Sequence, residues 1–214
     1  MRLTKLGHAC VRIEHDGSTL VIDPGVAPFA DALAALDGAD GVLVTHQHAD
    51  HLDVAAVQQA CSANPNLWVV VPHDTVDALE LAGQQVRGVG VGEDFEVAGF
   101  AVATVGGRHA TIHPDLPAPP DNIGYVIGGG AVYHPGDAFA SAEVAIDTLL
   151  VPLHAPWSKL SEVVDFVRAV TPQRAFAVHD GLLNEQGLGL VGGHIGKLGR
   201  TDYERLAPGQ SVEI

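Results

Sequence analysis

Cysteine is scarce in this chain, and no motif for a serine nucleophile is present. The 214 residues include 2 cysteines, Cys10 and Cys61, which lie in apolar contexts without CxxC spacing. We expect both to be buried and reduced, and neither to bind a metal. No GxSxG pattern occurs, which excludes a nucleophile elbow.

Basic residues and long apolar runs are also few. The chain has 11 Lys and Arg against 26 Asp and Glu, a formal net charge of -15. Nucleic-acid-binding proteins usually carry a basic patch, so we expect a small-molecule substrate and no nucleic-acid partner. No run approaches the roughly 20 apolar residues that span a bilayer, and residues 1–8 lack the apolar core of a secretory signal. We therefore expect no membrane partner and a cytoplasmic location, and the oligomeric state stays open.

Short apolar segments divide the chain without repeats, linkers or low-complexity tracts. Its length suits one domain over residues 1–214. Strands come first and later alternate with helices, roughly in two halves, which indicates an α/β (or α+β) fold of packed layers. A proline-rich loop at 113–120 is of the kind that shapes substrate pockets. We predict strands at 2–6, 9–14, 18–22, 42–44, 67–71, 123–127, 148–151, 174–178 and 211–214, short β segments within 85–105, and helices at 29–36, 54–61, 74–81 (ending near Gly83) and 158–170.

The most informative segment is residues 45–51, Thr-His-Gln-His-Ala-Asp-His, which puts three imidazoles and one carboxylate within six residues. It directly follows the apolar run 41–44, so the cluster is expected at the end of a buried strand. Imidazole nitrogen and carboxylate oxygen are the ligands that borderline divalent metals prefer. The segment therefore predicts a metal site.

This HxHxDH segment resembles the signature of the metallo-β-lactamase superfamily. That superfamily has further ligands after later strands, and His109, Asp137 and His179 each follow an apolar run at a matching place. The resemblance implies a four-layer αββα sandwich, metallo-β-lactamase-like, with metals at the seam of two mixed sheets. It also implies the ligand sets, which are His46, His48 and His109 for one ion, Asp50, His51 and His179 for a second, and Asp137 bridging the two.

The resemblance further implies an enzyme, a metal-dependent hydrolase with two divalent ions. We expect zinc, with manganese, iron or nickel as alternatives. Two ions about 3.5–4 Å apart lower the pKa of a shared water, so that hydroxide attacks a carbonyl carbon or a phosphorus. Asp50 is the expected catalytic residue, because it is placed to bind metal and to orient this nucleophile.

Other polar residues are candidates for substrate contact or for holding a ligand in place. His8 resembles the opening of a lactonase-like branch of the superfamily, where a histidine lies near the metals; the alternative is a core or turn histidine. Asp23 either holds a ligand imidazole or forms a turn before Pro24. His154 either lines the pocket or caps the following helix. His134 is expected in strand packing or ligand support.

Several segments are similar to small metal-dependent hydrolases related to ascorbate-6-phosphate lactonase, namely residues 7–9, 121–125, 133–137 and the helix before the last ligand strand. Ala138 departs from them, because relatives often have threonine there. This similarity favours a lactone or another ester-type small molecule as substrate. A phosphodiesterase with the same site is the alternative. A metal-dependent redox module or non-catalytic metal binder is less favoured, because redox relatives usually replace the second histidine by glutamate and carry a flavin domain.

Overall fold

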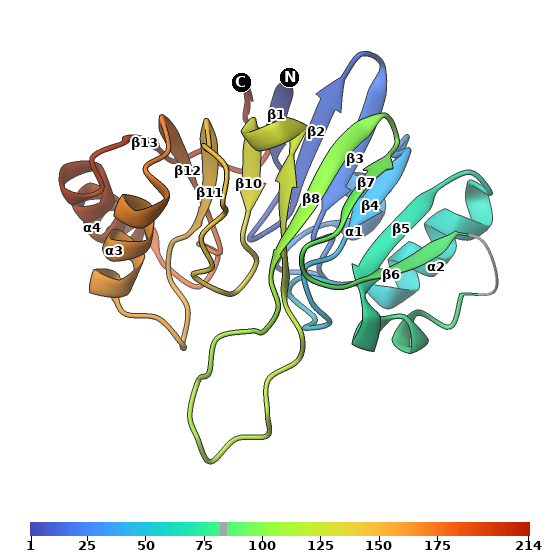
Figure 1. Ribbon diagram of the computed structural model, residues 1–214, viewed down its shortest axis with the longest axis horizontal. Helices are drawn as coiled ribbons and strands as arrows, with labels where there is room; N and C mark the ends of the chain where they lie inside the picture. The colour runs from blue at the N-terminus through green and yellow to red at the C-terminus, as the bar shows by residue number, and fades with distance from the viewer. Residues whose placement is uncertain (82–84) are drawn as a thin grey trace.

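Two seven-stranded sheets pack face to face, with helices on their outer sides (Figure 1). This computed structural model describes residues 1–81 and 85–214. The strand orders are β14-β1-β2-β3-β4-β5-β6 and β13-β12-β11-β10-β9-β8-β7, so the predicted αββα sandwich is confirmed. The elements are β1 (Arg2–Lys5), β2 (Val11–His15), β3 (Ser18–Ile22), α1 (Ala32–Leu36), β4 (Gly41–Leu43), α2 (Val54–Ala63), β5 (Trp68–Pro72), β6 (Val86–Val89), β7 (Asp94–Val97), β8 (Phe100–Gly106), β9 (Ile123–Ile127), β10 (Val132–His134), β11 (Thr148–Pro152), α3 (Leu160–Val170), β12 (Arg174–Val178), α4 (Glu185–Leu198), β13 (Asp202–Glu204) and β14 (Ser211–Glu213).

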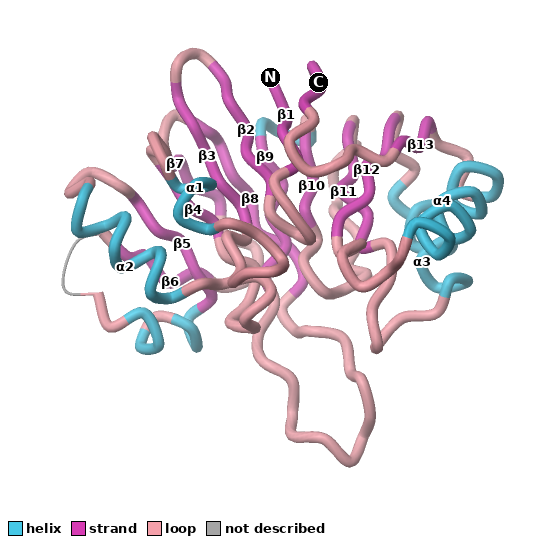
Figure 2. Tube along the Cα trace, turned by 180° about the vertical axis from the view of Figure 1, so that it is seen from behind, coloured by secondary structure: helices cyan, strands magenta, loops and turns pink. Residues whose placement is uncertain are grey.

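The two sheets repeat one plan. In the first sheet β1, β2 and β3 pair antiparallel, and β3 to β6 then pair parallel. In the second, β7 to β10 pair antiparallel, and β10 to β13 pair parallel. Figure 2 shows the same arrangement from behind, with α1 and α2 beside one sheet and α3 and α4 beside the other. The C-terminal β14 pairs with β1, so it joins the sheet formed by the N-terminal half.

Alternation along the strands builds three apolar layers. Successive strand residues point to opposite faces. Leu20 and Ile22 therefore join the core between the sheets, while Val21 packs with α1 and α2. In the second sheet Phe176 points inward, and Ala175 packs on the α3 side. Both faces of these strands are buried, which explains their continuous apolar sequences.

Some predicted elements differ from the structure. The predicted helix at 74–81 is wrong: two short 3-10 turns, His73–Thr75 and Asp77–Leu79, occupy it, and Glu80 ends the second in a left-handed conformation. Its predicted end near Gly83 lies outside the described residues. The helix predicted at 29–36 begins only at Ala32, after Asp31 caps the Ala34 amide. Helix α4 and strand β13 were not predicted from the sequence.

One end of the sandwich carries the loops that matter for function. Loops after β3, β4, β8, β10 and β12 meet there, together with the β1–β2 connection. The connection between β8 and β9 is the longest of these and projects away from both sheets (Figure 1). Among the described residues, no helix has the length and apolarity needed to cross a membrane.

Candidate metal centre

Segments far apart in the sequence converge at this end of the sandwich. The β4 loop supplies His46, His48, Asp50 and His51, and single residues come from the later loops. Their possible ligand atoms form three groups, within each of which all atoms lie within 4.8 Å of one another. The groups are His46, His48 and His109; His8, Asp50, His51 and His179; and His46, His51 and Asp137.

Asp137 lies between the two predicted ligand sets. Its Oδ1 is 3.2 Å from Nε2 of His51, and its Oδ2 is 3.3 Å from Nε2 of His109 and 3.0 Å from Nε2 of His179. One carboxylate thus contacts histidines of both sets, which is the position expected for a bridging ligand. Gly136, with φ 63°, precedes it, and a Cβ there would overlap Oδ1 of Asn122.

Hydrogen bonds at Nδ1 orient the rings of His46, His109 and His179. Nδ1 of His109 lies 2.6 Å from the Ala110 carbonyl oxygen, and Nδ1 of His179 lies 2.8 Å from that of His154. Since a carbonyl oxygen only accepts, each Nδ1 donates a proton to it, and each Nε2 is thereby turned toward the cluster. His46 is held likewise, with Nδ1 3.0 Å from Oγ1 of Thr45.

Asp23 supports the β4 loop. Its fully buried carboxylate accepts from the Thr45 amide at 2.7 Å, from Oγ1 of Thr45 at 2.8 Å and from Nδ1 of His51 at 2.6 Å. Its backbone is in the left-handed region, with φ 54°. The first interpretation of Asp23 from the sequence therefore describes its geometry, because the carboxylate fixes the ring of His51.

His8 differs from the other histidines of the cluster. Its Nδ1 accepts from the Gly181 amide at 2.9 Å, so Nε2 carries the proton. That Nε2 lies 3.3 Å from Oδ2 of Asp50. His8 therefore lies in the cluster, as one sequence interpretation expected, but it presents a proton donor and not a lone pair.

His154 supports the site through its backbone, and both ring nitrogens of His134 are bonded to backbone groups. The part-buried His154 contributes its backbone carbonyl to His179, and its imidazole makes no hydrogen bond to the described residues. Nε2 of His134 donates to the Ala9 carbonyl at 3.0 Å, and its Nδ1 accepts from the Gly136 amide at 3.1 Å. His134 thus supports the Asp137 loop, as predicted.

Two residues in the site were not predicted from the sequence. The Trp157 indole N–H donates to Oδ2 of Asp137 at 2.9 Å. The buried Asn122 accepts from the Asp137 amide at 2.9 Å and donates to the Pro135 carbonyl at 2.9 Å. The only available signal for Trp157 was its rarity, since the chain has 2 tryptophans and this one follows a strand end.

Buried charges shape the protonation of the cluster. Burial alone would raise the pKa of Asp137, but the surrounding histidines, His51 first, hold it well below its usual range. Burial would lower the pKa of His51, yet Asp137 and Asp23 together raise it well above its ordinary value. Burial lowers the pKa of His46. The cluster thus combines ionised carboxylates with one imidazole of raised pKa, that of His51, and one of lowered pKa, that of His46.

The donor set fits divalent cations. Among the described residues, Nε2 of His51, Nε2 of His179 and Oδ1 of Asp137 are buried without a hydrogen-bond partner. Nε2 of His46 also faces Nδ1 of His48 at 3.1 Å. Buried polar atoms are normally paired, so inward-facing unpaired atoms of this kind match a cation site.

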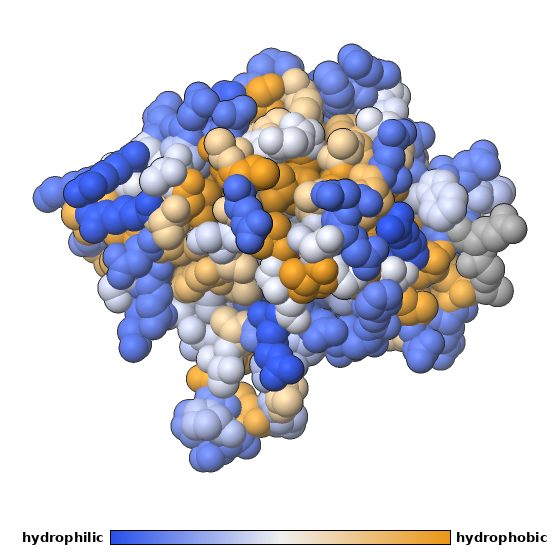
Figure 3. Space-filling model, in the orientation of Figure 1, coloured by the Kyte–Doolittle hydropathy of each residue, from blue (hydrophilic) through white to orange (hydrophobic). Residues whose placement is uncertain are grey.

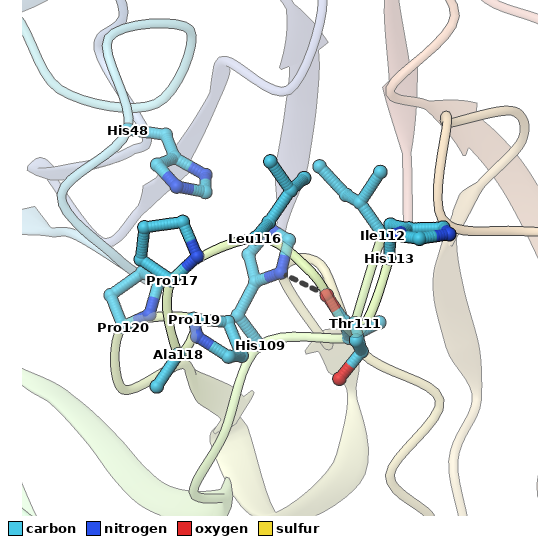
Figure 4. A pocket seen from close by; sticks show the side chains of 11 residues that line it. His48, His109, Thr111, Ile112, His113, Leu116, Pro117, Ala118, Pro119 and Pro120 are labelled. Carbon is cyan, nitrogen blue, oxygen red and sulfur yellow. Dashed lines mark hydrogen bonds between the residues drawn. The ribbon is translucent and has the colours of Figure 1, made fainter.

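A pocket of about 270 Å³ adjoins the cluster. His48 and His109 form its inner wall, and the loop between β8 and β9 forms the rest (Figure 4). In Figure 4 the side chains of Ile112 and Leu116 point to the same side of this loop.

Comparisons with known proteins agree with this geometry. The family model described as "Beta-lactamase superfamily domain" matches residues 2–179. Protein Rv0786c of Mycobacterium tuberculosis is 35% identical over 99% of this chain and 99% of its own length. UPF0173 metal-dependent hydrolase MK1542 of Methanopyrus kandleri is 29% identical over 85% of this chain and 84% of its own. Igni18, a metallo hydrolase from Ignicoccus hospitalis, superposes with a TM-score of 0.76 at 20% identity, covering 99% of this chain and 97% of that one.

The fold and the histidine–aspartate cluster define a metal-dependent hydrolase. Within that class, the chain belongs to the beta-lactamase superfamily, and its fold is the metallo-β-lactamase fold. The predicted family and enzyme class are confirmed.

Proposed function

We propose that this hydrolase acts on an uncharged ester-type small molecule, a lactone or a related ester, with two divalent ions of which zinc is the first expectation. The observation that carries the proposal is the position of Asp137 between the two histidine sets, where Nε2 of His51 and Nε2 of His179 are buried without a hydrogen-bond partner. His46, His48 and His109 would hold one ion, Asp50, His51 and His179 the other, and Asp137 both. Such a pair supplies a water of lowered pKa and polarises a substrate oxygen.

The chain's own residues define the open side of the site. The Asp50 side chain is 24% exposed, whereas that of Asp137 is 4% exposed. A substrate therefore approaches over Asp50 and the partly exposed His48, beside the pocket. Nε2 of His179 and Nε2 of His8 lie 3.5 and 3.3 Å from Oδ2 of Asp50, and these contacts outweigh burial and lower the pKa of Asp50. Asp50 thus stays an acceptor at neutral pH and can orient a water through its remaining lone pairs.

The charge around the site favours an ester over a phosphodiester. None of the described residues that line the pocket is Lys or Arg, and the formal net charge of the chain is -15. An anionic substrate would be repelled at long range by the net charge, and in the pocket it would find no cationic side chain, so that only the bound metal ions could offset its charge. The same charge supports a small-molecule partner and not a nucleic acid.

The test is metal analysis followed by a substrate pair. We expect about two divalent ions per chain in protein purified without chelator, and hydrolysis of γ-butyrolactone in preference to bis-p-nitrophenyl phosphate. Preferential cleavage of the phosphodiester would replace the proposal by the alternative. Protein that binds no metal would overturn both.

A further inference from the structure

The pocket beside the cluster is built mainly from apolar side chains. Ile112, Leu116 and three prolines contribute most of its outer wall. Ile112 is 49% exposed and Leu116 is 53% exposed, although both are large apolar residues. Figure 3 shows apolar residues among polar ones on this projecting loop, at the bottom of the view. The volume of the pocket, about 270 Å³, is close to the lower end of the roughly 300–1,000 Å³ common for ligand pockets.

The base of the loop is held at the site. The His109 amide donates to the Pro120 carbonyl at 3.1 Å, and the Ala110 amide donates to the Asp137 carbonyl at 2.9 Å. The Asp121 amide donates to Oδ2 of Asp74 at 2.9 Å. Prolines restrict the backbone between these points. These bonds therefore tie the pocket wall to His109 and Asp137, which are themselves candidate metal ligands.

The electrostatic character of the pocket limits what it can bind. The titratable side chains that line it are His48, His109 and His113. Asp115 lies on the same loop with its side chain 90% exposed, 3.7 Å from His113. No Lys, Arg, Asp or Glu is among the residues that line the pocket, since the exposed Arg108 and Asp115 of the same loop both lie outside its lining. An uncharged apolar group would cover Ile112 and Leu116.

Because His48 and His109 belong both to the cluster and to the pocket wall, a substituent of a molecule that reacts at the cluster can extend along this wall. We propose that the pocket binds the uncharged, apolar acyl or alkyl substituent of the ester substrate, with Ile112 and Leu116 as the residues that determine this specificity. The inference rests on the proposed function and narrows its substrate class to esters or lactones bearing a neutral hydrocarbon chain.

Binding of alkyl hydroxamates tests the inference without turnover. The probes are acetohydroxamic acid, hexanohydroxamic acid and adipic acid monohydroxamate, titrated into zinc-loaded protein by calorimetry. One fully buried methylene tightens binding about fourfold. Since the pocket is partly open, we expect hexanohydroxamic acid to bind about tenfold or more tighter than acetohydroxamic acid. The adipic derivative, with a terminal carboxylate, should lose most of that gain.

Substitutions of Ile112 and Leu116 test whether these side chains cause the gain in affinity with chain length. Leu116→Ser and Ile112→Ser should each remove part of the chain-length gain and leave acetohydroxamic acid unchanged. The matched control is Leu190→Ser, because Leu190 is 64% exposed on α4; it should bind all three probes like the unchanged protein. Equal affinity for the acetyl and hexanoyl probes, or equal loss of both in Leu116→Ser, would overturn the inference while leaving the proposed metal centre intact. If neither probe binds, the proposed centre is wrong and the inference fails with it.

Discussion

The amide of Gly181 donates to Nδ1 of His8 at 2.9 Å, while the other ring nitrogen of His8 faces Asp50 at 3.3 Å. This pair of contacts fixes His8 as a donor to Asp50. We predict that His8→Ala keeps the full metal content but loses about 10- to 100-fold in kcat/KM, because a part-buried carboxylate loses its donor. His8→Gln, whose amide can donate from a similar place, should recover part of the loss. Elemental analysis with ester kinetics measures both; loss of one metal equivalent in His8→Ala would show that His8 is a ligand.

The bridging position of Asp137 leads to a second prediction. Asp137→Ala and His48→Ala should both lose metal and activity, because each removes a donor from a set of three or four. The fold should persist, as followed by circular dichroism. His194→Ala, an exposed histidine on α4, is the matched control and should keep metal and activity. Full metal content in Asp137→Ala and His48→Ala would contradict the ligand assignment.

The proton on His179 predicts how the metal-free protein responds to pH. Burial lowers the pKa of His179, but hydrogen bonds to Asp137 and Asp50 outweigh it and raise the pKa from 6.5 to about 9. A raised pKa in the folded state stabilises the protein fully below pH 6.5, and this contribution is lost as the pH rises toward 9. We expect the Tm of chelator-treated protein to fall over that interval.

Two comparisons check this effect. His179→Gln should show a smaller fall in Tm, and His194→Ala should behave like the unchanged chain. Zinc binding near pH 7.5 should release protons, because the cation replaces them. A constant Tm from pH 6.5 to 9 in the chelated protein, or zinc uptake without proton release, would argue against a protonated His179.

Replacing Lys5, which is buried, is expected to lower the free energy of unfolding substantially. Its Nζ lies 2.7 Å from Oδ1 of Asp180 and 2.8 Å from the Ala177 carbonyl, and the two side chains are 2% and 7% exposed. Lys5→Met leaves Asp180 with Arg205 as its remaining charged partner at 3.3 Å. Removing one partner of a buried pair costs about 3–5 kcal/mol, and the retained Arg205 places the expected loss near the lower value. Urea unfolding measures it.

The control for Lys5 is Lys197→Met, an exposed lysine in the last turn of α4. It should change the free energy of unfolding by less than about 0.5 kcal/mol. A loss below about 1 kcal/mol in Lys5→Met would mean that the pair adds little beyond its desolvation.

The sequence was most informative where chemistry and periodicity coincide. The HxHxDH segment and the three later strand-end residues were sufficient to predict the cluster, because a metal site needs a restricted set of side chains. Continuous apolar runs located β3, β4, β5, β9, β11 and β12, since those strands are buried on both faces.

Other features depend on packing that local sequence does not report. Helix α4 contains five glycines, which have low helix propensity. Its Gly192 is explained only by Tyr203, whose hydroxyl would lie 2.8 Å from a Cβ at that position. The Trp157 and Asn122 contacts with Asp137 likewise require three separate loops to be placed together. The predicted 74–81 helix failed because two short turns replace it, of which the first packs against β6 and the second against α2.

The pairing of β14 with β1 has a consequence for assembly of the catalytic apparatus. The last strand crosses back to the sheet made by residues 2–89, while His109, Asp137 and His179 come from the other half. A chain cut between β6 and β7 would thus yield two fragments, neither with a complete set of donors. Zinc binding after the two fragments are mixed would show that the two sheets reassemble, with the three-residue strand β14 pairing again with β1.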